Sequence, residues 1–296
     1  MRIHQWVKNL LLFVPLVMSH QIARWDGGGS QLLVKVTLAA LAFSFCASAV
    51  YVLNDLLDIE SDRAHPVKRL RPFASGALST RAGWVIIPSA LIVGLGLALA
   101  VHNDRFLLIL LAYLLVTTAY SFRLKRMAVL DILVLAGLFT LRLFAGAVAA
   151  QIPPSPWLLA FSTFLFLTLA FAKRFAELSV LTASGAAPSA RRPYALADQP
   201  WLGTLGAVSG YLAVLVFALY INNSPDVKSL YTRPDVLWFM CPILLYAVTR
   251  LWSRAYRGQI PDDPIATVIR DPASYVVAAL MACVIWIATL PAASAG

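Results

Sequence analysis

Charged residues are scarce in this chain of 296 residues: they make up 13% of it, whereas soluble proteins contain about 25%. The apolar fraction is correspondingly high, at 60%. A soluble protein of this size could not bury so much apolar surface, so the composition excludes a soluble enzyme and a disordered chain. It predicts an integral membrane protein that forms a single domain over residues 1–296.

Cysteine is also rare, and Cys46, Cys241 and Cys283 all lie inside apolar segments. These positions exclude a disulfide framework, and no C-x-x-C pair indicates a metal site. The sequence also lacks glycine-rich nucleotide loops, zinc-protease motifs and serine nucleophile elbows. Acidic residues number 14 against 24 lysines and arginines, for a net charge of +10. This excess indicates either ordinary basic loops beside the membrane or an anionic substrate; we expect no nucleic-acid partner.

Long apolar runs are what the sequence has in quantity. A helix that crosses a bilayer needs about 20 apolar residues, and the runs are continuous, which excludes a β-barrel. Candidate spans lie at 9–23, 32–53, 84–101, 106–122, 128–150, 157–175, 201–221, 235–252 and 274–291. We therefore predict an all-α membrane fold with about nine transmembrane helices. The first run lacks a small-residue cleavage site, so we expect a retained helix and not a signal peptide.

The basic residues divide unevenly between the loops on the two sides of these spans. One side receives most of the 24 lysines and arginines, together with the long polar segments 54–83, 176–200 and 253–273. The other side receives only Arg24, Lys35, Arg105, Lys228 and Arg233. Because basic loops stay in the cytoplasm, we place the N-terminus and any active site on the cytoplasmic face of a bacterial-type inner membrane.

A polar segment follows the second predicted span and reads Tyr51-Val-Leu-Asn54-Asp55-Leu-Leu-Asp58-Ile-Glu60-Ser-Asp62. On a continuing helix Tyr51, Asn54, Asp55, Asp58 and Asp62 share one face. Carboxylates gathered on one face repel each other unless a cation lies among them, and hard oxygen ligands at this spacing suit Mg²⁺. A solvated helix end is the alternative interpretation.

Cations follow this acidic face almost at once. Lys68, Arg69 and Arg71 precede a small-residue turn, Ala74-Ser75-Gly76. Carboxylates that hold a metal, next to cations that hold phosphate, are what a Mg²⁺–diphosphate needs. A solvated helix end does not explain this second cluster.

The pattern Asn-Asp-x-x-Asp-x-x-x-Asp at the end of the second of nine spans resembles the first aspartate motif of the UbiA-type prenyltransferase superfamily. The resemblance implies helices around a central cavity that opens to the cytoplasmic side, with the motif binding Mg²⁺ and a diphosphate. It makes Asn54, Asp58 and Asp62 the expected metal ligands. Asp55, Asp58 and Asp62 are the expected catalytic residues.

Two further segments carry polar residues near the membrane. Tyr120-Ser121-Phe-Arg123-Leu-Lys125, followed by Asp131, resembles the Tyr-Ser/Thr-x-x-Leu-Lys segment of the same family, which implies that Tyr120 and Lys125 face the diphosphate. A basic loop is the alternative. Arg142 lies inside a span, about three helical turns after Asp131, where an arginine costs on the order of 3 kcal/mol. It should face a polar cavity or pair with an anion, and a purely structural Arg–carboxylate pair is the alternative.

The sixth span ends in Lys173-Arg174-Phe-Ala-Glu177, where most of the superfamily carries a second aspartate pair. A cationic end is poor for a second metal but suits a phosphate monoester. Together with Gln5-Trp6-Val-Lys8-Asn9 and His65-Pro66-x-Lys68-Arg69-x-Arg71-Pro72, this segment resembles one branch in particular, the decaprenyl-phosphate phosphoribosyltransferases.

The resemblance implies a Mg²⁺-dependent transfer of a 5-phosphoribosyl group from phosphoribosyl diphosphate to a polyprenyl phosphate in the bilayer. Transfer of a prenyl group from its diphosphate to an aromatic or other acceptor stays open as the alternative, and a transporter is a third, weaker reading. Homo-oligomer formation is left open. The expected substrate-binding residues are Lys8, Tyr51, Asn54, Asp58, Lys68, Arg71, Tyr120, Ser121, Lys125, Asp131, Arg142, Lys173, Arg174 and Glu177.

Overall fold

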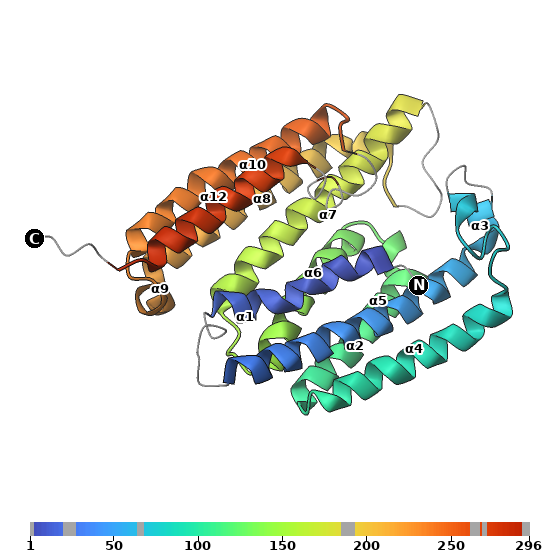
Figure 1. The fold of residues 1–296 in the computed structure, drawn as a ribbon. Coiled ribbons are helices and arrows are strands. Elements are labelled where there is room, and N and C mark those ends of the chain that lie inside the picture. The colour runs from blue at the N-terminus through green and yellow to red at the C-terminus, as the bar shows by residue number, and fades with distance from the viewer. Residues whose placement is uncertain are drawn as a thin grey trace, which may run out of the picture. The chain divides into compact units, whose positions relative to one another are not determined.

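The computed structural model describes residues 3–19, 28–63, 68–184, 193–260, 267 and 271–291. Every regular element within these ranges is a helix, which confirms the predicted all-α fold class. The chain divides into two compact units, which are described separately (Figure 1). Unit 1 comprises Met1–Arg123 with Leu141–Pro154, and unit 2 comprises Leu124–Thr140 with Ser155–Gly296.

Unit 1 is built around one long helix, α2, and its packing partners. Its elements are η1 (Ile3–Phe13), α1 (Val14–Met18), α2 (Gly28–Leu57), α3 (Ile59–Arg63), η3 (Lys68–Leu70), α4 (Thr80–Ala100), α5 (Asp104–Phe122) and the second half of α6 (Leu130–Ala149). α2 packs along α4, and also against η1 and α5.

Unit 2 begins with the first half of α6 and continues to the C-terminal helix. Its other elements are η4 (Leu124–Arg126), α7 (Pro156–Ser184), η5 (Leu196–Asp198), α8 (Gln199–Asn223), α9 (Pro225–Leu230), η6 (Pro234–Phe239), α10 (Met240–Tyr256) and α12 (Pro272–Thr289). α7 packs along α8, and α10 packs against both α8 and α12.

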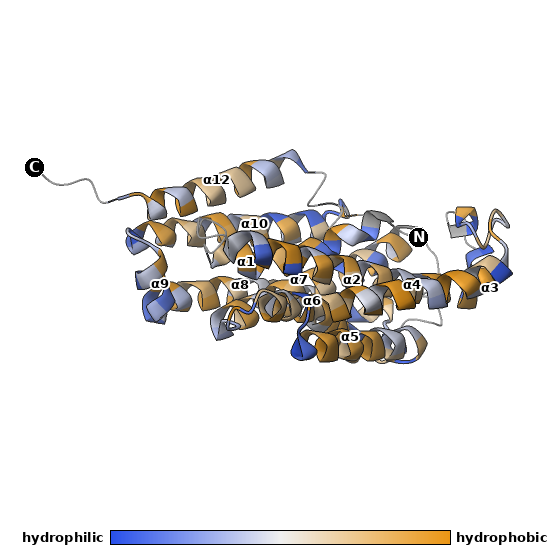
Figure 2. Cartoon of the chain, turned by 60° about the horizontal axis from the view of Figure 1, so that its bottom comes forward, coloured by the Kyte–Doolittle hydropathy of each residue, from blue (hydrophilic) through white to orange (hydrophobic). Residues whose placement is uncertain are grey.

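Eight of the nine predicted spans are helices long and apolar enough to cross a membrane. Many large apolar side chains on them are exposed, including Ile92 and Leu115 at 72% each, as expected for surfaces that face lipid. Figure 2 shows apolar residues along the long helices, with polar ones gathered at short elements such as α3 and α9. The protein is therefore an integral membrane protein.

The first predicted span, 9–23, is the exception. The described segment Gln5–Met18 is apolar but shorter than a span, and it consists of a 3-10 helix followed by one α-helical turn. Pro15 at the start of α1 and the polar residues before it explain the short irregular helix. Residues 20–27, which include the predicted end of this span, lie outside the described residues.

The packing of α2 against α4 depends on small residues. A Cβ atom added to Gly94 of α4 would lie 2.7 Å from the sulfur of Cys46 and 3.1 Å from the carbonyl oxygen of Ala42, both on α2. Because lipid provides no hydrophobic driving force between helices, such close backbone approach is how membrane helices gain contact energy. It fixes α2, whose C-terminal end carries the polar segment.

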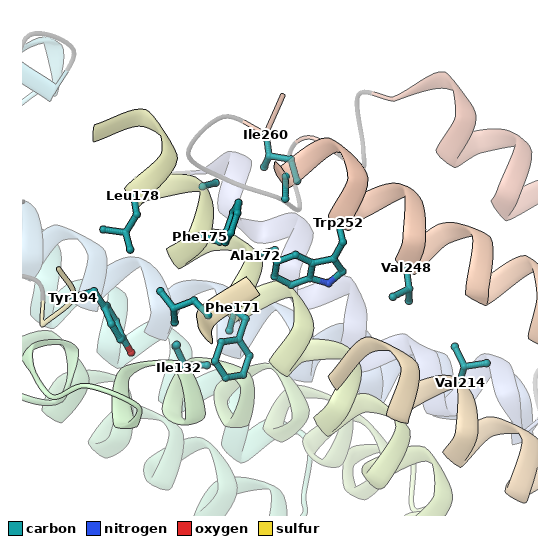
Figure 3. Close-up of a cluster of buried hydrophobic side chains, with 14 of the residues drawn as sticks. Ile132, Phe171, Ala172, Phe175, Leu178, Tyr194, Val214, Val248, Trp252 and Ile260 are labelled. Carbon is teal, nitrogen blue, oxygen red and sulfur yellow. The ribbon is translucent and has the colours of Figure 1, made fainter. Parts of the chain in front are cut away.

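Unit 2 has its own apolar core, formed by α7, α8, α10 and the first turns of α6 (Figure 3). Phe171, Phe175 and Trp252 lie at its centre, and the rings of Phe175 and Trp252 pack edge to face with centroids 5.8 Å apart. The indole nitrogen of Trp252 donates to Thr168, whose hydroxyl donates to the carbonyl of Gly206. These bonds satisfy the polar atoms that the core buries.

Candidate functional site

The polar segment at the end of α2 keeps helical geometry beyond the last residue of that helix. The backbone N–H of Asp58 donates to the carbonyl of Asn54 at 3.0 Å, and that of Asp62 donates to the carbonyl of Asp58 at 2.8 Å. These are bonds of the α-helical i to i−4 type across the junction of α2 and α3. Asn54, Asp58 and Asp62 therefore lie on one face, as the spacing predicts. We call Asn54, Asp55, Asp58 and Asp62 the carboxylate face.

Arg71 is the cation that the structure brings to the carboxylate face. Its Nη1 atom lies 2.7 Å from Oδ2 of Asp62 and 3.4 Å from Oδ1 of Asp55. Asp55 and Asp62 are buried, whereas the side chain of Arg71 is 28% exposed. Asp58 shares this face and is partly buried, so carboxylate oxygens of three residues lie at this helix end together with Arg71. Hard oxygen donors of this kind suit a divalent cation.

The turn that follows η3 positions Arg71. The Nε atom of Arg63, at the end of α3, donates to the carbonyl of Ala74 at 3.1 Å, and the N–H of Ser75 donates to the carbonyl of Arg71. Gly76 has a φ of +82°, a value that glycine adopts without steric cost. The predicted Ala74-Ser75-Gly76 turn thus folds the chain back beside α3.

Asn54 is held in one orientation by Ser121 at the end of α5. The hydroxyl of Ser121 donates its only proton to the carbonyl of Thr117 at 2.8 Å, so it can only accept from Asn54. The amide nitrogen of Asn54 donates to it at 2.9 Å. The amide oxygen of Asn54 therefore points away from Ser121, and it is left as an oxygen donor on the carboxylate face.

The N-terminal helix carries a second polar group of unit 1. Asn9 donates to Ser44 of α2 at 2.8 Å and accepts at 3.0 Å from Nε of Arg142. The Nη2 atom of Arg142 donates to Tyr113 at 2.8 Å, and its guanidinium carbon lies 4.9 Å from the centre of that ring. Arg142 thus ties α5, α6 and η1 together from the inside of unit 1.

Unit 2 contains a different kind of polar group, in which Asp131, Arg174 and Tyr194 are buried and Glu177 is 25% exposed. The Nε atom of Arg174 lies 2.6 Å from Oδ2 of Asp131, and its Nη1 atom lies 2.6 Å from Oε2 of Glu177. The side chains of Arg174 and Asp131 are 1% and 0% exposed. The hydroxyl of Tyr194 donates to Oδ1 of Asp131. We call Asp131, Arg174, Glu177 and Tyr194 the buried ion group.

Tyr194 is a member of this group that the sequence does not reveal. It lies at the edge of the apolar core (Figure 3), accepts a hydrogen bond from the N–H of Val129 at 3.0 Å, and is 3% exposed. Burial, together with its hydrogen bond to Asp131, raises the pKa of Tyr194 well above its ordinary value near 10. Tyr113 and Asn9 could have been found from the sequence, because polar side chains inside apolar runs need partners. Tyr194 lies outside the apolar runs, so the sequence gives no such indication for it.

The remaining predicted residues come from several elements of the two units. Tyr51 is on α2, Tyr120 is at the end of α5, Lys8 is on η1, and all three are partly buried in unit 1. Lys125 and Lys173 are partly buried in unit 2. The side chain of Lys68 lies outside the described residues. Substrate contacts for all of these stay predictions.

The carboxylate face contains part of a candidate set of metal ligands. Within the part of the chain that the structure describes, no three His, Cys, Asp or Glu side chains converge as a complete set of metal ligands. The donors present are hard oxygens, among them the amide oxygen of Asn54 and the carboxylate of Asp58. Mg²⁺ is commonly held by one or two carboxylates together with substrate phosphates and water, so a partial set of this kind fits it.

Comparison with known sequences shows which proteins this chain is similar to. A model described as the UbiA prenyltransferase family matches residues 12–179. The nodulation protein NoeC of Azorhizobium caulinodans is 35% identical over 93% of this chain and 87% of its own length. A decaprenyl-phosphate phosphoribosyltransferase of Mycobacterium tuberculosis is 33% identical over 99% of this chain and 92% of its own. An uncharacterized protein, y4nM of Sinorhizobium fredii, is 37% identical over 95% of this chain, which spans only 54% of that protein.

Solved structures agree on the fold. A UbiA homolog from Aeropyrum pernix matches with a TM-score of 0.65 at 17% identity, covering 97% of this chain and 98% of the other. A UbiA homolog from Archaeoglobus fulgidus, solved with DMAPP and Mg²⁺, matches with a TM-score of 0.64 at 17% identity, covering 95% and 99%. At this identity the likeness concerns the helical fold alone.

Proposed function

We propose that this chain, which belongs to the UbiA prenyltransferase family and is a membrane transferase, transfers a 5-phosphoribosyl group. The substrates are phosphoribosyl diphosphate and a polyprenyl phosphate, and the products are a lipid-linked 5-phosphoribosyl group and diphosphate. The phosphoribosyltransferase relative supports this proposal because it matches nearly the whole length of both chains. The observation that carries it is the carboxylate face, where oxygen donors and Arg71 lie together at the end of α2.

The carboxylate face would hold the diphosphate end of the donor with Mg²⁺. Asn54 and Asp58 present the oxygens for the ion, with Asp62 the third expected ligand, while Asp55 and Asp62 also hold Arg71 in place. When bound, Mg²⁺ neutralises the negative charge that develops on the leaving diphosphate. The Archaeoglobus homolog, solved with Mg²⁺ and an isoprenoid diphosphate, supports this part of the proposal.

The basic side chains would hold the phosphate groups that the metal does not contact. Lys8, Lys68, Tyr120 and Lys125 are our candidates for the diphosphate oxygens. Lys173 is our candidate for the lipid phosphate or the sugar 5-phosphate. A second phosphorylated substrate needs a cationic subsite of its own, and a segment with Lys173 where an acidic pair is usual supplies one.

The bonds exchanged need no nucleophile from the protein. An oxygen of the lipid phosphate forms a bond to C1 of the ribose, and the bond from C1 to the diphosphate oxygen breaks with its electron pair leaving on the diphosphate. A phosphate dianion is already nucleophilic, so no side chain has to remove a proton from it. The chain's own residues contribute by orienting the two substrates and by stabilising charge, which suffices for an oxocarbenium-like transition state.

Prenyl transfer from a prenyl diphosphate to an aromatic or other acceptor is the second candidate. The family to which the chain belongs favours it, and the carboxylate face would serve either donor equally well. Lys173, in a segment where an acidic pair is usual, favours the first candidate, because a single diphosphate donor with a neutral acceptor has no use for a second cationic subsite.

An assay with two substrate pairs separates these candidates. Purified protein in lipid vesicles with Mg²⁺ is given either labelled phosphoribosyl diphosphate with a polyprenyl phosphate, or a labelled prenyl diphosphate with an aromatic acid. We expect labelled lipid only from the first pair. Turnover of the second pair alone would refute the proposal and leave prenyl transfer in its place.

Orientation and domain organisation form part of the same proposal. We propose that residues 1–296 form one transferase domain, with the N-terminus and the carboxylate face on the cytoplasmic side of a bacterial-type inner membrane, where phosphoribosyl diphosphate is made available. The uneven distribution of basic residues supports this orientation. Labelling of single cysteines introduced at Arg69 and at Asn222, in whole cells with an impermeant maleimide, tests it.

A further inference from the structure

A pocket in unit 2 lies outside the residues assigned to the transfer reaction. It has a volume of about 450 Å³, within the range of about 300–1,000 Å³ that is usual for small-molecule sites. Its lining comes from the second half of α10, from the residues just after that helix, and from Asp271 before α12. Arg250, Arg254 and Arg257 are among the lining residues.

The three arginines lie on the side of α10 that points away from the core. Val248, Trp252 and Ala255 are buried and form one stripe of this helix. At 100° per residue, Arg250 and Arg257 lie about opposite Val248. A polar stripe on a membrane helix is costly against lipid tails, so this surface needs a polar or charged neighbour.

Asp271 holds two of these arginines in place, but its single negative charge does not neutralise both of them. Its Oδ2 atom accepts from Nε of Arg250 at 3.1 Å and from Nη1 of Arg254 at 3.0 Å, and its Oδ1 atom accepts from Nη2 of Arg250 at 3.2 Å. One carboxylate cannot satisfy all the donors of two guanidiniums. Among the described lining residues, Arg257 is a third arginine beside the one carboxylate of Asp271, and two of the guanidiniums are already positioned.

The surroundings of the pocket suit the boundary between headgroups and acyl chains. Arg250 lies six residues before the end of α10, which is about 9 Å along the helix. The exposed rings of Tyr246, Tyr256 and Tyr275 lie on α10 and on the first turn of α12, and tyrosine is enriched at membrane interfaces. The N-terminus of α12, which follows Asp271, adds positive potential toward an anion.

We infer that this pocket binds the phosphate of an anionic phospholipid headgroup, with Arg254 and Arg257 as its principal contacts. The hydroxyl of Ser253 lines the same pocket and can donate to a remaining phosphate or glycerol oxygen. The site is independent of the proposed transfer reaction, because none of its lining residues belongs to the carboxylate face or to the basic segments assigned to substrate. It would be filled by the surrounding membrane and not by a substrate.

Native mass spectrometry of the full-length protein in neutral detergent tests the inference. The protein is titrated with phosphatidylglycerol, with phosphatidylcholine of the same chains, and with inorganic phosphate. We expect tight binding of one phosphatidylglycerol, weak binding of phosphatidylcholine, and no stable phosphate adduct. Equal binding of the two lipids, or equally tight binding of inorganic phosphate, would overturn a site for an anionic lipid.

Variants locate the bound lipid. Arg254→Gln with Arg257→Gln should weaken phosphatidylglycerol binding about 30-fold, because each basic residue near a membrane surface contributes roughly a factor of five. Arg81→Gln with Arg105→Gln, two exposed arginines at other helix ends, removes the same charge and should change binding less than threefold. If the first double variant does not fold, the exposed Arg257 is replaced alone, and a loss of about fivefold is expected.

Two results would contradict the assignment. Undiminished phosphatidylglycerol binding in the variants of α10 would place the lipid elsewhere. A two-chain species that disappears in these variants would show that the polar stripe contacts a second copy of the chain instead.

Discussion

The carboxylate face of unit 1 and the buried ion group of unit 2 start from similar sequence patterns but are built differently. Both consist of acidic and basic residues spaced along helix ends. In the first, Asp55 and Asp62 contact the guanidinium of Arg71, whose side chain is 28% exposed. In the second, Arg174 is 1% exposed, and the carboxylates of Asp131 and Glu177 and the hydroxyl of Tyr194 complete the group.

The difference in burial and pairing between the two groups distinguishes a group that binds a ligand from one that stabilises the fold. Charges withdrawn from solvent must be paired, and a group whose donors and acceptors are already matched has little left for a ligand. A partly exposed group of hard oxygen donors can gain from a bound divalent cation. We therefore infer that the carboxylate face binds the metal–diphosphate and that Asp131 and Arg174 hold α6 against α7.

The largest expected effect is on stability, in the buried ion group. Asp131→Asn removes the charge that Arg174 faces, so the free energy of unfolding should fall by about 3–5 kcal/mol. Reversible unfolding in mixed micelles measures this change. Asp131→Asn combined with Arg174→Gln should recover most of the loss, because neither charge is then buried alone.

A different outcome would move this group into the substrate site. If Asp131→Asn kept full stability while raising the KM for polyprenyl phosphate, then Arg174 would be a substrate contact, as the sequence pattern predicts, and the contrast between the two regions would fail.

The next effect is on activity, in the carboxylate face. Asp58→Asn should lower kcat/KM by about 10²–10³-fold, since it removes charge from the oxygens that hold the metal. The free energy of unfolding should change by no more than about 0.5 kcal/mol, because Asp58 is only partly buried. Steady-state kinetics over a range of Mg²⁺ concentrations, with a melting curve for each sample, measures both. Retained activity at low Mg²⁺ would remove Asp58 from the proposed metal site.

A smaller effect on stability, expected at alkaline pH, distinguishes the buried ion group from the carboxylate face. Since the pKa of Tyr194 is higher in the folded protein than in the unfolded chain, its contribution to stability is complete below about pH 10 and is lost as the pH rises toward the folded value. Tyr194→Phe should lower the free energy of unfolding by about 1–3 kcal/mol at neutral pH.

This prediction is checked by comparing the free energy of unfolding of the wild type and of Tyr194→Phe over a range of pH. The difference in stability between them should shrink above about pH 10, while Asp58→Asn should follow the wild type throughout. A difference that stays constant to the highest accessible pH would show that the Tyr194 hydroxyl does not support Asp131 in this way.

The smallest expected effect concerns the orientation of Asn54. Ser121→Ala frees the amide to rotate, so the apparent affinity for Mg²⁺ in the transfer reaction should fall about tenfold, as for other residues that orient metal ligands. The matched control is Ser89→Ala, which removes the hydroxyl of an exposed serine whose bond goes to its own helix backbone. Equal effects from both changes would argue against an orienting role for Ser121.

Sequence reasoning reached the fold and the carboxylate face because both are encoded in local patterns. Apolar runs of sufficient length predict eight helices that the structure contains, and the spacing of Asn54, Asp58 and Asp62 predicts the face that they share. The first span, 9–23, is described only in part: the described apolar segment Gln5–Met18 is shorter than a span, and residues 20–27 lie outside the described residues.

Partners far apart in the sequence were beyond this reasoning. The contacts of Arg71 with Asp55 and Asp62 were not predicted, and its contact with a phosphate stays a prediction. Arg142 was expected to face a cavity or an anion, and its contacts include Asn9 and Tyr113, which lie on other helices. Nothing in the spacing of the chain indicates that Tyr194 meets Asp131, because tertiary packing alone brings them together.

Binding of a metal–diphosphate to purified protein is the measurement that tests the central claim most directly. Mn²⁺ with inorganic diphosphate, followed by electron paramagnetic resonance, reports the bound ion without any turnover. We expect Asp58→Asn to lose binding of Mn²⁺ with diphosphate. The double variant Asp131→Asn with Arg174→Gln should keep this binding within about threefold of the wild type. Loss of binding in the second variant with retention in the first would contradict the account.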